Sequence, residues 1–139
     1  MKFHLIFLLL MTLLSLRAQA EIAIIVHPQS PIARLSLNEV SDLYLGRTRK
    51  VGSDSVMVLE HHDTNPVRER FFLKLNGMDL SRVNAYWARL QFSGNLQSPL
   101  RVRDDKAMLE VVRRNRHAIG YVDAALISDD VRTIGRLAE

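Results

Sequence analysis

One short segment of the sequence gathers side chains that could bind an anion. His62, Asp63, Thr64 and Asn65 lead directly into a predicted helix whose first turn holds Arg68. The start of a helix presents free backbone N–H groups and the positive end of the helix dipole, and a guanidinium forms charge-assisted hydrogen bonds with oxyanions. The segment therefore predicts an oxyanion site. The simpler interpretation, that Asn65 only caps the helix and Arg68 only points into solvent, stays open.

Two adjacent histidines in the same segment also suggest a metal site. His61 and His62 could join His27, which follows an earlier predicted strand, because imidazole is a common ligand of zinc and copper. Neighbouring residues of an extended segment point to opposite faces, so at most one of the two can join a given cluster. We predict no metal site and no cofactor, and metal capture by one of these histidines is kept as a third hypothesis.

Patterns typical of enzymes are absent from the sequence. It contains no Gly-x-Ser-x-Gly nucleophile elbow, no Gly-x-x-x-x-Gly-Lys phosphate loop and no pair of carboxylates with recognisable catalytic spacing. It also contains no cysteine, which excludes thiol catalysis, thiolate zinc sites and disulfides. We predict a protein that is not an enzyme and has no catalytic residues.

Strands and helices alternate along the chain and position the candidate segment. Apolar runs predict strands over residues 22–26, 56–59 and 118–122, with a short fourth strand over 131–134. Capping residues predict four intervening helices, which begin after Ser36, Asn65, Asp79 and Asp104 or Asp105. This order predicts an α/β fold with a mostly parallel sheet covered by helices on both faces. Ligands bind at the carboxyl ends of strands in such sheets, which adds Ser30 as a secondary candidate.

The connecting segments carry most of the polar residues. Residues 46–54 and 91–99 are predicted loops, and Asn115 is a predicted left-handed cap of the last helix. Two basic runs, Arg47–Lys50 and Arg113–Arg116, are typical of solvated surfaces, with contact to a partner or an anionic surface as the alternative.

The first twenty residues have the pattern of a secretory signal peptide. Lys2 precedes an apolar run from Leu5 to Leu16, and the small residues Ala18 and Ala20 occupy the positions before the cleavage site. The run is shorter than the roughly 20 residues that a membrane-spanning helix needs. We expect cleavage after Ala20 and a periplasmic protein, not embedded in the membrane, with a single domain over residues 21–139.

The expected mature chain is nearly neutral. Removal of residues 1–20 leaves 119 residues, with 17 basic and 15 acidic side chains, so the formal net charge falls from +4 to +2. Proteins that bind nucleic acid concentrate a large positive excess on one face, so we expect no nucleic-acid partner. The length suits one domain and excludes a multi-domain enzyme.

Several motifs, in their order and spacing, point to a known family. They are Val26-His27-Pro28, Leu43-Tyr44-Leu45-Gly46-Arg47, the segment from Val58 to Phe71, Tyr86-Trp87, and Ile119-Gly120-Tyr121-Val122 preceded by Asn115. In this arrangement the chain resembles the phosphate ABC-transporter substrate-binding proteins, and in particular the short, single-domain members of that periplasmic-binding-protein-like group. The resemblance covers residues 22–134.

The resemblance implies one lobe of a type II periplasmic-binding-protein fold and the binding of phosphate or a related oxyanion. It places the family's phosphate loop on residues 63–67, where Asp63 keeps its type and Thr64 and Asn65 offer a hydroxyl and an amide. Pro66 stands where the family has glycine and removes a backbone donor, for which the charge of Arg68 could compensate. The candidate anion ligands are Ser30, His62, Asp63, Thr64, Asn65 and Arg68.

Two functions remain open at this point. The first is a periplasmic solute-binding-like protein for phosphate or a related oxyanion, linked to ABC-type phosphate uptake through a membrane permease. The second is an adaptor that keeps the fold, has lost the ligand and binds an envelope protein. A single lobe leaves the ligand partly in water, which weakens charge-assisted contacts. A homodimer would restore a closed cleft.

Overall fold

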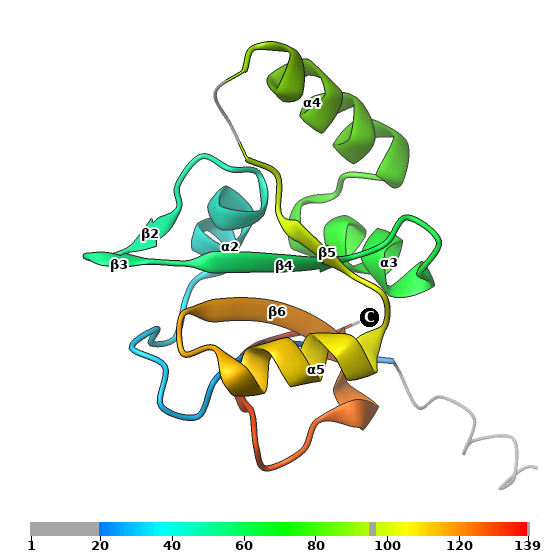
Figure 1. The fold of residues 1–139 in the computed structure, drawn as a ribbon. Coiled ribbons are helices and arrows are strands. Elements are labelled where there is room, and N and C mark those ends of the chain that lie inside the picture. Colours follow the sequence, from blue (N-terminus) through cyan, green and yellow to red (C-terminus); the bar gives the residue numbers. More distant parts are fainter. Residues whose placement is uncertain (1–19, 95–96, 139) are drawn as a thin grey trace, which may run out of the picture.

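The computed structural model describes residues 20–94 and 97–138, so the predicted signal peptide up to residue 19 lies outside the described residues. The elements, drawn in Figure 1, are β1 (Ile22–Val26), α2 (Leu37–Tyr44), β2 (Lys50–Val51), β3 (Asp54–Ser55), β4 (Met57–His61), α3 (Pro66–Asn76), α4 (Leu80–Phe92), β5 (Leu100–Val102), α5 (Asp105–Arg114), β6 (Ala118–Asp123), the 3-10 helix η2 (Ala124–Leu126) and β7 (Arg132–Leu137). None of the helices within the described ranges has the length and apolar character needed to cross a membrane.

The main sheet has the strand order β5-β4-β6-β1-β7. β4 is parallel to β5 and β6, whereas β1 is antiparallel to both β6 and β7. The mostly parallel sheet that the sequence predicts is therefore confirmed, with β1 as the strand that runs against the others. Val26, the last residue of β1, pairs with Ile119 near the start of β6. The loop after β1 consequently lies at the opposite end of the sheet from the loop after β4.

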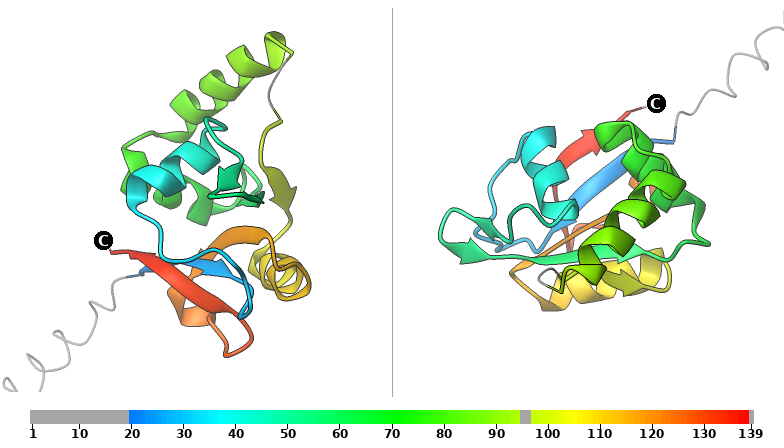
Figure 2. Two further views of the ribbon diagram at one scale, coloured as in Figure 1. Left: turned by 90° about the vertical axis from the view of Figure 1, so that its left-hand side faces the viewer. Right: turned by 90° about the horizontal axis from the view of Figure 1, so that it is seen from above.

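Helices cover both faces of this sheet, as the sequence predicts. Alternate residues of β1 divide between two buried clusters, since Ile22, Ile24 and Val26 join one and Ala23 and Ile25 join the other. The first cluster packs beneath α2, α3 and α4, and the second packs against α5. Burial of every β1 side chain explains why this strand shows no polar alternation. Figure 2 shows α4 projecting from the rest of the molecule.

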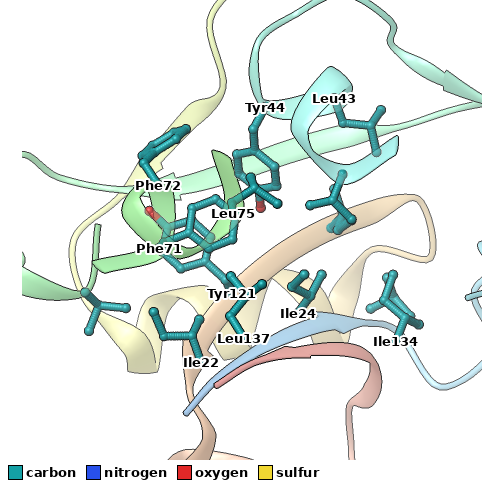
Figure 3. Packing of buried hydrophobic residues seen from close by; sticks show 14 of the residues in the cluster. Ile22, Ile24, Leu43, Tyr44, Phe71, Phe72, Leu75, Tyr121, Ile134 and Leu137 are labelled. Carbon is teal, nitrogen blue, oxygen red and sulfur yellow. The ribbon is translucent and has the colours of Figure 1, made fainter. Parts of the chain in front are cut away.

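Aromatic side chains fill the centre of the larger cluster (Figure 3). The rings of Phe71 and Tyr121 stack with centroids 3.7 Å apart, and Tyr44 meets Phe71 edge to face at 4.7 Å. The hydroxyl of Tyr44 donates a 2.8 Å hydrogen bond to the carbonyl oxygen of Leu59 in β4. Packing therefore accounts for these aromatic residues, which join α2 and α3 to the sheet.

The predicted helix starts are all confirmed. Ser36 and Glu39 form a reciprocal capping box at α2, and the side chains of Asn65, Asp79 and Asp104 each accept a backbone N–H bond at the starts of α3, α4 and α5. Short-range chemistry thus fixes these boundaries.

Two local predictions are wrong, and one strand was not predicted. Residues 46–54 are not only a loop, since they contribute to the β2–β3 hairpin, and the unpredicted strand β5 follows the predicted loop at 91–99. These strands are two or three residues long, too short to show a hydrophobic period. Asn115 is extended, with φ −134° and ψ 111°, rather than left-handed. Its carbonyl oxygen accepts the N–H of Ala118, so the chain turns directly from α5 into β6.

Gly46, which ends α2, provides a test of the fold. Its φ of +69° lies in the left-handed region, and an added Cβ would lie 2.7 Å from Cη2 of the buried Trp87 ring. Gly52 has a similar φ of +60° but open space around it. We expect Gly52→Ala to lower the free energy of unfolding by about 1–2 kcal/mol through its backbone alone. We expect Gly46→Ala to lower it by about 1–3 kcal/mol more, through overpacking. Urea unfolding of both variants measures the difference, and equal losses would contradict the Trp87 contact.

Candidate functional site

The start of α3 lies directly beyond the carboxyl end of β4, where the sequence places the candidate site. Oδ1 of Asn65 accepts a hydrogen bond from the N–H of Val67 at 3.0 Å. The backbone carbonyl oxygen of Asn65 accepts one from the N–H of Arg68 at 3.1 Å. Pro66 has no N–H. The first backbone donors of α3 are therefore used inside the protein, and a ligand here would depend on side chains.

Arg68 is completely buried, so the interpretation that it points into solvent is wrong. Its Nη1 lies 2.9 Å from Oδ1 of Asp63, and its Nε lies 3.4 Å from Oε2 of Glu60. The same Nη1 donates to Oδ1 of Asn84 in α4 at 3.1 Å, and the guanidinium lies 5.4 Å from the ring centre of Phe72. Arg68 thus joins β4, the following loop, α3 and α4.

A second arginine closes a ring of charges. Nε of Arg101, in β5, lies 3.3 Å from Oε1 of Glu60, and its Nη1 lies 3.3 Å from Oδ2 of Asp63. Each carboxylate therefore meets both guanidinium groups. We call Glu60, Asp63, Arg68 and Arg101 the charge cluster. The side chains of Glu60 and Arg68 are buried, whereas those of Asp63 and Arg101 are 47% and 42% exposed.

Burial raises the pKa of Glu60 above its ordinary value, and the two arginines lower it by less than burial raises it. This carboxyl therefore binds its proton more tightly than a solvated glutamate does. When Glu60 carries that proton, the charge cluster holds two positive charges and only the negative charge of Asp63. The cluster then attracts anions.

A cavity of about 400 Å³ lies beside the charge cluster. Glu60 and Arg101 line it together with Trp87 and Gln91 of α4 and residues 98–100. Among the residues that the structure describes, two buried N–H donors of the charge cluster and the cavity wall have no hydrogen-bond partner, namely Nη2 of Arg68 and Nε1 of Trp87. Oxyanions offer only acceptor atoms, so a site with surplus donors suits them chemically.

His61 has a positioning role between these elements. Its buried ring lies with Nδ1 3.2 Å from Nδ2 of Asn65 and Nε2 3.0 Å from the carbonyl oxygen of Tyr121. Because an amide nitrogen only donates, Nδ1 is the acceptor and Nε2 carries the hydrogen. Oδ1 of Asp105 also lies 2.9 Å from Nε2, without an aligned hydrogen bond. Both ring nitrogens are therefore engaged, and among the described residues no group of three or more His, Cys, Asp or Glu could hold a metal ion.

The structure brings together only part of the predicted residue set. Asp63, Asn65 and Arg68 adjoin one another, and His62 and Thr64 are exposed in the same loop. Ser30 lies at the other end of the sheet, where its hydroxyl accepts the N–H of Ile32 at 3.1 Å. His27 lies in the same loop as Ser30, and it is therefore also at the opposite end of the sheet from His61.

Sequence reasoning missed Glu60, Arg101 and Trp87 as site residues. An acid that ends the apolar run Val58-Leu59 was a usable signal, because a glutamate in a buried strand needs a charged partner. Arg101 gave no such signal, since its strand was not predicted. Trp87 belongs to the buried core and also lines the cavity.

The two arginines of the charge cluster should differ in their effect on stability. Arg68→Ala leaves the carboxylate of Glu60 buried without its main partner, so we expect a loss of about 3–5 kcal/mol in the free energy of unfolding. Arg101→Ala removes a half-exposed ion pair, for which we expect a loss of about 0.2–1 kcal/mol. Urea unfolding compares the two variants. Similar losses would contradict the central place of Arg68.

The raised pKa of Glu60 predicts a pH dependence of stability. A carboxyl that binds its proton more tightly in the folded protein stabilises it fully at pH below the unfolded value of 4.5, and this contribution is lost as pH rises through the folded pKa. We therefore expect the stability of the wild-type chain relative to Glu60→Gln to fall as pH rises from about 4 to about 8. Urea unfolding of both proteins across this range checks the trend, and a constant or rising difference would contradict it.

Comparison with known proteins gives matches at the level of structure. No protein-family model matches the sequence, and no curated protein matches it. An ABC-type phosphate transport receptor from Vibrio cholerae aligns with a TM-score of 0.65 at 16% identity, over 84% of this chain and 46% of the receptor. A Clostridium perfringens protein assigned to the phosphate ABC transporter substrate-binding proteins, with bound phosphate, aligns with a TM-score of 0.65 at 20% identity, over 83% of this chain and 45% of that protein.

A third similar structure, PstS from Borrelia burgdorferi, aligns with a TM-score of 0.57 at 12% identity, over 76% of this chain and 42% of that protein. The chain spans less than half the length of each of these proteins. It therefore has the fold of one lobe of a phosphate-type periplasmic binding protein, as the motif resemblance implied.

Proposed function

We propose that this chain is an exported, solute-binding-like protein that recognises phosphate or a related oxyanion at the charge cluster and its adjoining cavity. The observation that carries this proposal is the surplus of buried donors in the described part of the chain. Nε1 of Trp87, which lines the cavity together with Arg101, has no acceptor, and neither has Nη2 of Arg68, whose guanidinium meets the same carboxylates as Arg101. The fold supports it, because the similar structures include a phosphate transport receptor and a protein with bound phosphate.

Asp63 suggests how an anion enters. Its two carboxylate oxygens meet Nη1 of Arg68 and Nη1 of Arg101, at 2.9 and 3.3 Å. A tetrahedral oxyanion presents pairs of oxygens to guanidinium groups in the same way. Asp63 is half exposed and lies in a loop, so its side chain can rotate outward into the solvent while the anion takes its place between the arginines. Before an anion binds, the carboxylate of Asp63 occupies the ligand's position.

Delivery of the anion to a membrane permease, after export to the periplasm, completes the proposal. The side chains of Asp63 and Arg101 are half exposed, so an anion bound there would keep a solvent-exposed side and could pass to a permease without a large opening motion. The same exposure lowers its affinity, because water competes for the charged groups. Weak binding, with release on contact, is the behaviour we expect.

Isothermal titration of residues 21–139 with phosphate and with sulfate tests anion binding. We expect Arg101→Ala to weaken phosphate binding by the ~1.5–3 kcal/mol typical of a hydrogen bond to a charged group. Arg113→Ala is the matched control, because Arg113 is also 42% exposed and forms a 2.8 Å ion pair with Asp130. Asp63→Asn should tighten binding, because it removes the competing charge.

The absence of both heat and thermal shift at millimolar phosphate and sulfate would overturn the anion proposal. In that case the adaptor hypothesis would be preferred. Equal weakening by Arg101→Ala and Arg113→Ala would show that overall charge, rather than the charge cluster, attracts the anion.

A further inference from the structure

A larger groove lies beside the other half of β4. Its volume is about 880 Å³, and Val56, Met57 and Val58 form one wall. Pro99 and Leu100 lie on the opposite wall, and Arg49 of the segment before β2 also lines it. The charge cluster begins further along the same strand, at Glu60, and residues 98–100 line both the groove and the smaller cavity beside that cluster. The groove therefore adjoins the proposed anion site, but none of the four residues of the charge cluster lines it.

Interrupted strand pairing explains why the groove exists. β4 pairs with β6 at Met57 and Val58, but its pairing with β5 begins only at Leu59 with Leu100. Pro99, which precedes β5, has no N–H to extend that ladder. Within the described ranges, Met57 and Val58 thus pair with a strand on one side only, and the groove runs along them. The N–H of the preceding Val56 donates a 2.8 Å hydrogen bond to the carbonyl oxygen of Arg49. A strand edge of this kind can pair with an extended segment of another chain.

The described residues that line the groove include a basic side chain and no acidic one. Arg49 and His117 are its ionisable lining residues, and no acidic residue is among the described residues that line it. The guanidinium of Arg49 reaches Gln97 across the groove, at 3.0 Å from Nη1 to Oε1 and 3.4 Å from Nη2 to the carbonyl oxygen. Lys50, which follows Arg49, is exposed. The basic run Arg47–Lys50, which the sequence indicates as a solvated surface or a contact for a partner, therefore borders an apolar groove.

We propose that this groove binds an extended, acidic segment of a partner protein. The backbone of that segment would lie beside residues 56–58, its apolar side chains would contact Leu43, Met57 and Leu100, and its carboxylates would meet Arg49. Apolar lining alone would accept many occupants. The positive charge at Arg49 and the absence of lining acids select an acidic one.

Fluorescence anisotropy with three labelled eight-residue peptides tests this inference. One peptide alternates Glu and Val, the second alternates Lys and Val, and the third alternates Glu and Ser. We expect saturable binding of the Glu–Val peptide alone, because it offers both carboxylates and apolar side chains. The binding should weaken as salt rises, since the charges involved are solvent-exposed. Equal binding of all three peptides, or no binding of the Glu–Val peptide up to millimolar protein, would overturn the proposal.

Two variants locate the binding in the groove. Arg49→Glu should weaken Glu–Val binding at least tenfold, whereas Arg34→Glu, the same charge change at an exposed position outside the groove, should leave it within twofold. Ser55→Trp, which would fill the groove from β3, should abolish binding while thermal unfolding shows an intact fold. Equal effects of Arg49→Glu and Arg34→Glu would contradict the inference.

The anion site and the groove can be judged separately. Arg101→Ala should leave peptide binding unchanged, and Arg49→Glu should leave phosphate binding unchanged. Loss of peptide binding in Arg101→Ala would contradict the groove as a site of its own. Failure of phosphate binding in the titration bears only on the charge cluster.

Discussion

A guanidinium that is buried out of water needs acceptors from the protein, and the acceptors of Arg68 come from several elements of this fold. Glu60 from β4, Asp63 from the following loop and Asn84 from α4 all converge on it. Removing a charge from water costs several kcal/mol unless partners replace the lost hydration. The four elements that supply these groups and Arg68 itself are therefore fixed relative to one another. α4, which projects from the body in Figure 2, depends on this contact and on Trp87 packing against Gly46.

The direction of β1 decides which loops can share a site. In a fully parallel sheet, the loops after β1 and β4 would lie at the same end, so Ser30 and Asp63 would share that end of the sheet. The antiparallel pairing of β1 with β6 and β7 places Ser30 at the far end instead. There the carbonyl oxygen of Ser30 accepts a 2.9 Å bond from Arg132 of β7, a structural role. One reversed strand thus removes a candidate ligand that would otherwise satisfy the rule for open sheets.

Local chemistry made most of the fold predictable from sequence. Caps such as Ser36 with Glu39, and Asn65 before Pro66, act over three residues or fewer and are readable in the printed chain. The charge cluster is different, because Arg101 and Glu60 are 41 residues apart and meet only through the pairing of β4 with β5. A strand of three residues with an exposed leucine has no pattern to reveal it. The interpretation that Arg68 points into solvent stayed open for the same reason, since arginine is seldom buried without partners and sequence alone does not locate such partners.

The burial of unpaired donors within this lobe bears directly on ligand binding. Arg68 is completely buried and Trp87 is only 5% exposed. In the described part of the chain, Nη2 of Arg68 and Nε1 of Trp87 have no acceptor. An unpaired donor in a dry site costs about 1–3 kcal/mol of stability. A small acceptor that paired with these donors would remove that cost, so the anion binding that we propose would also stabilise the fold.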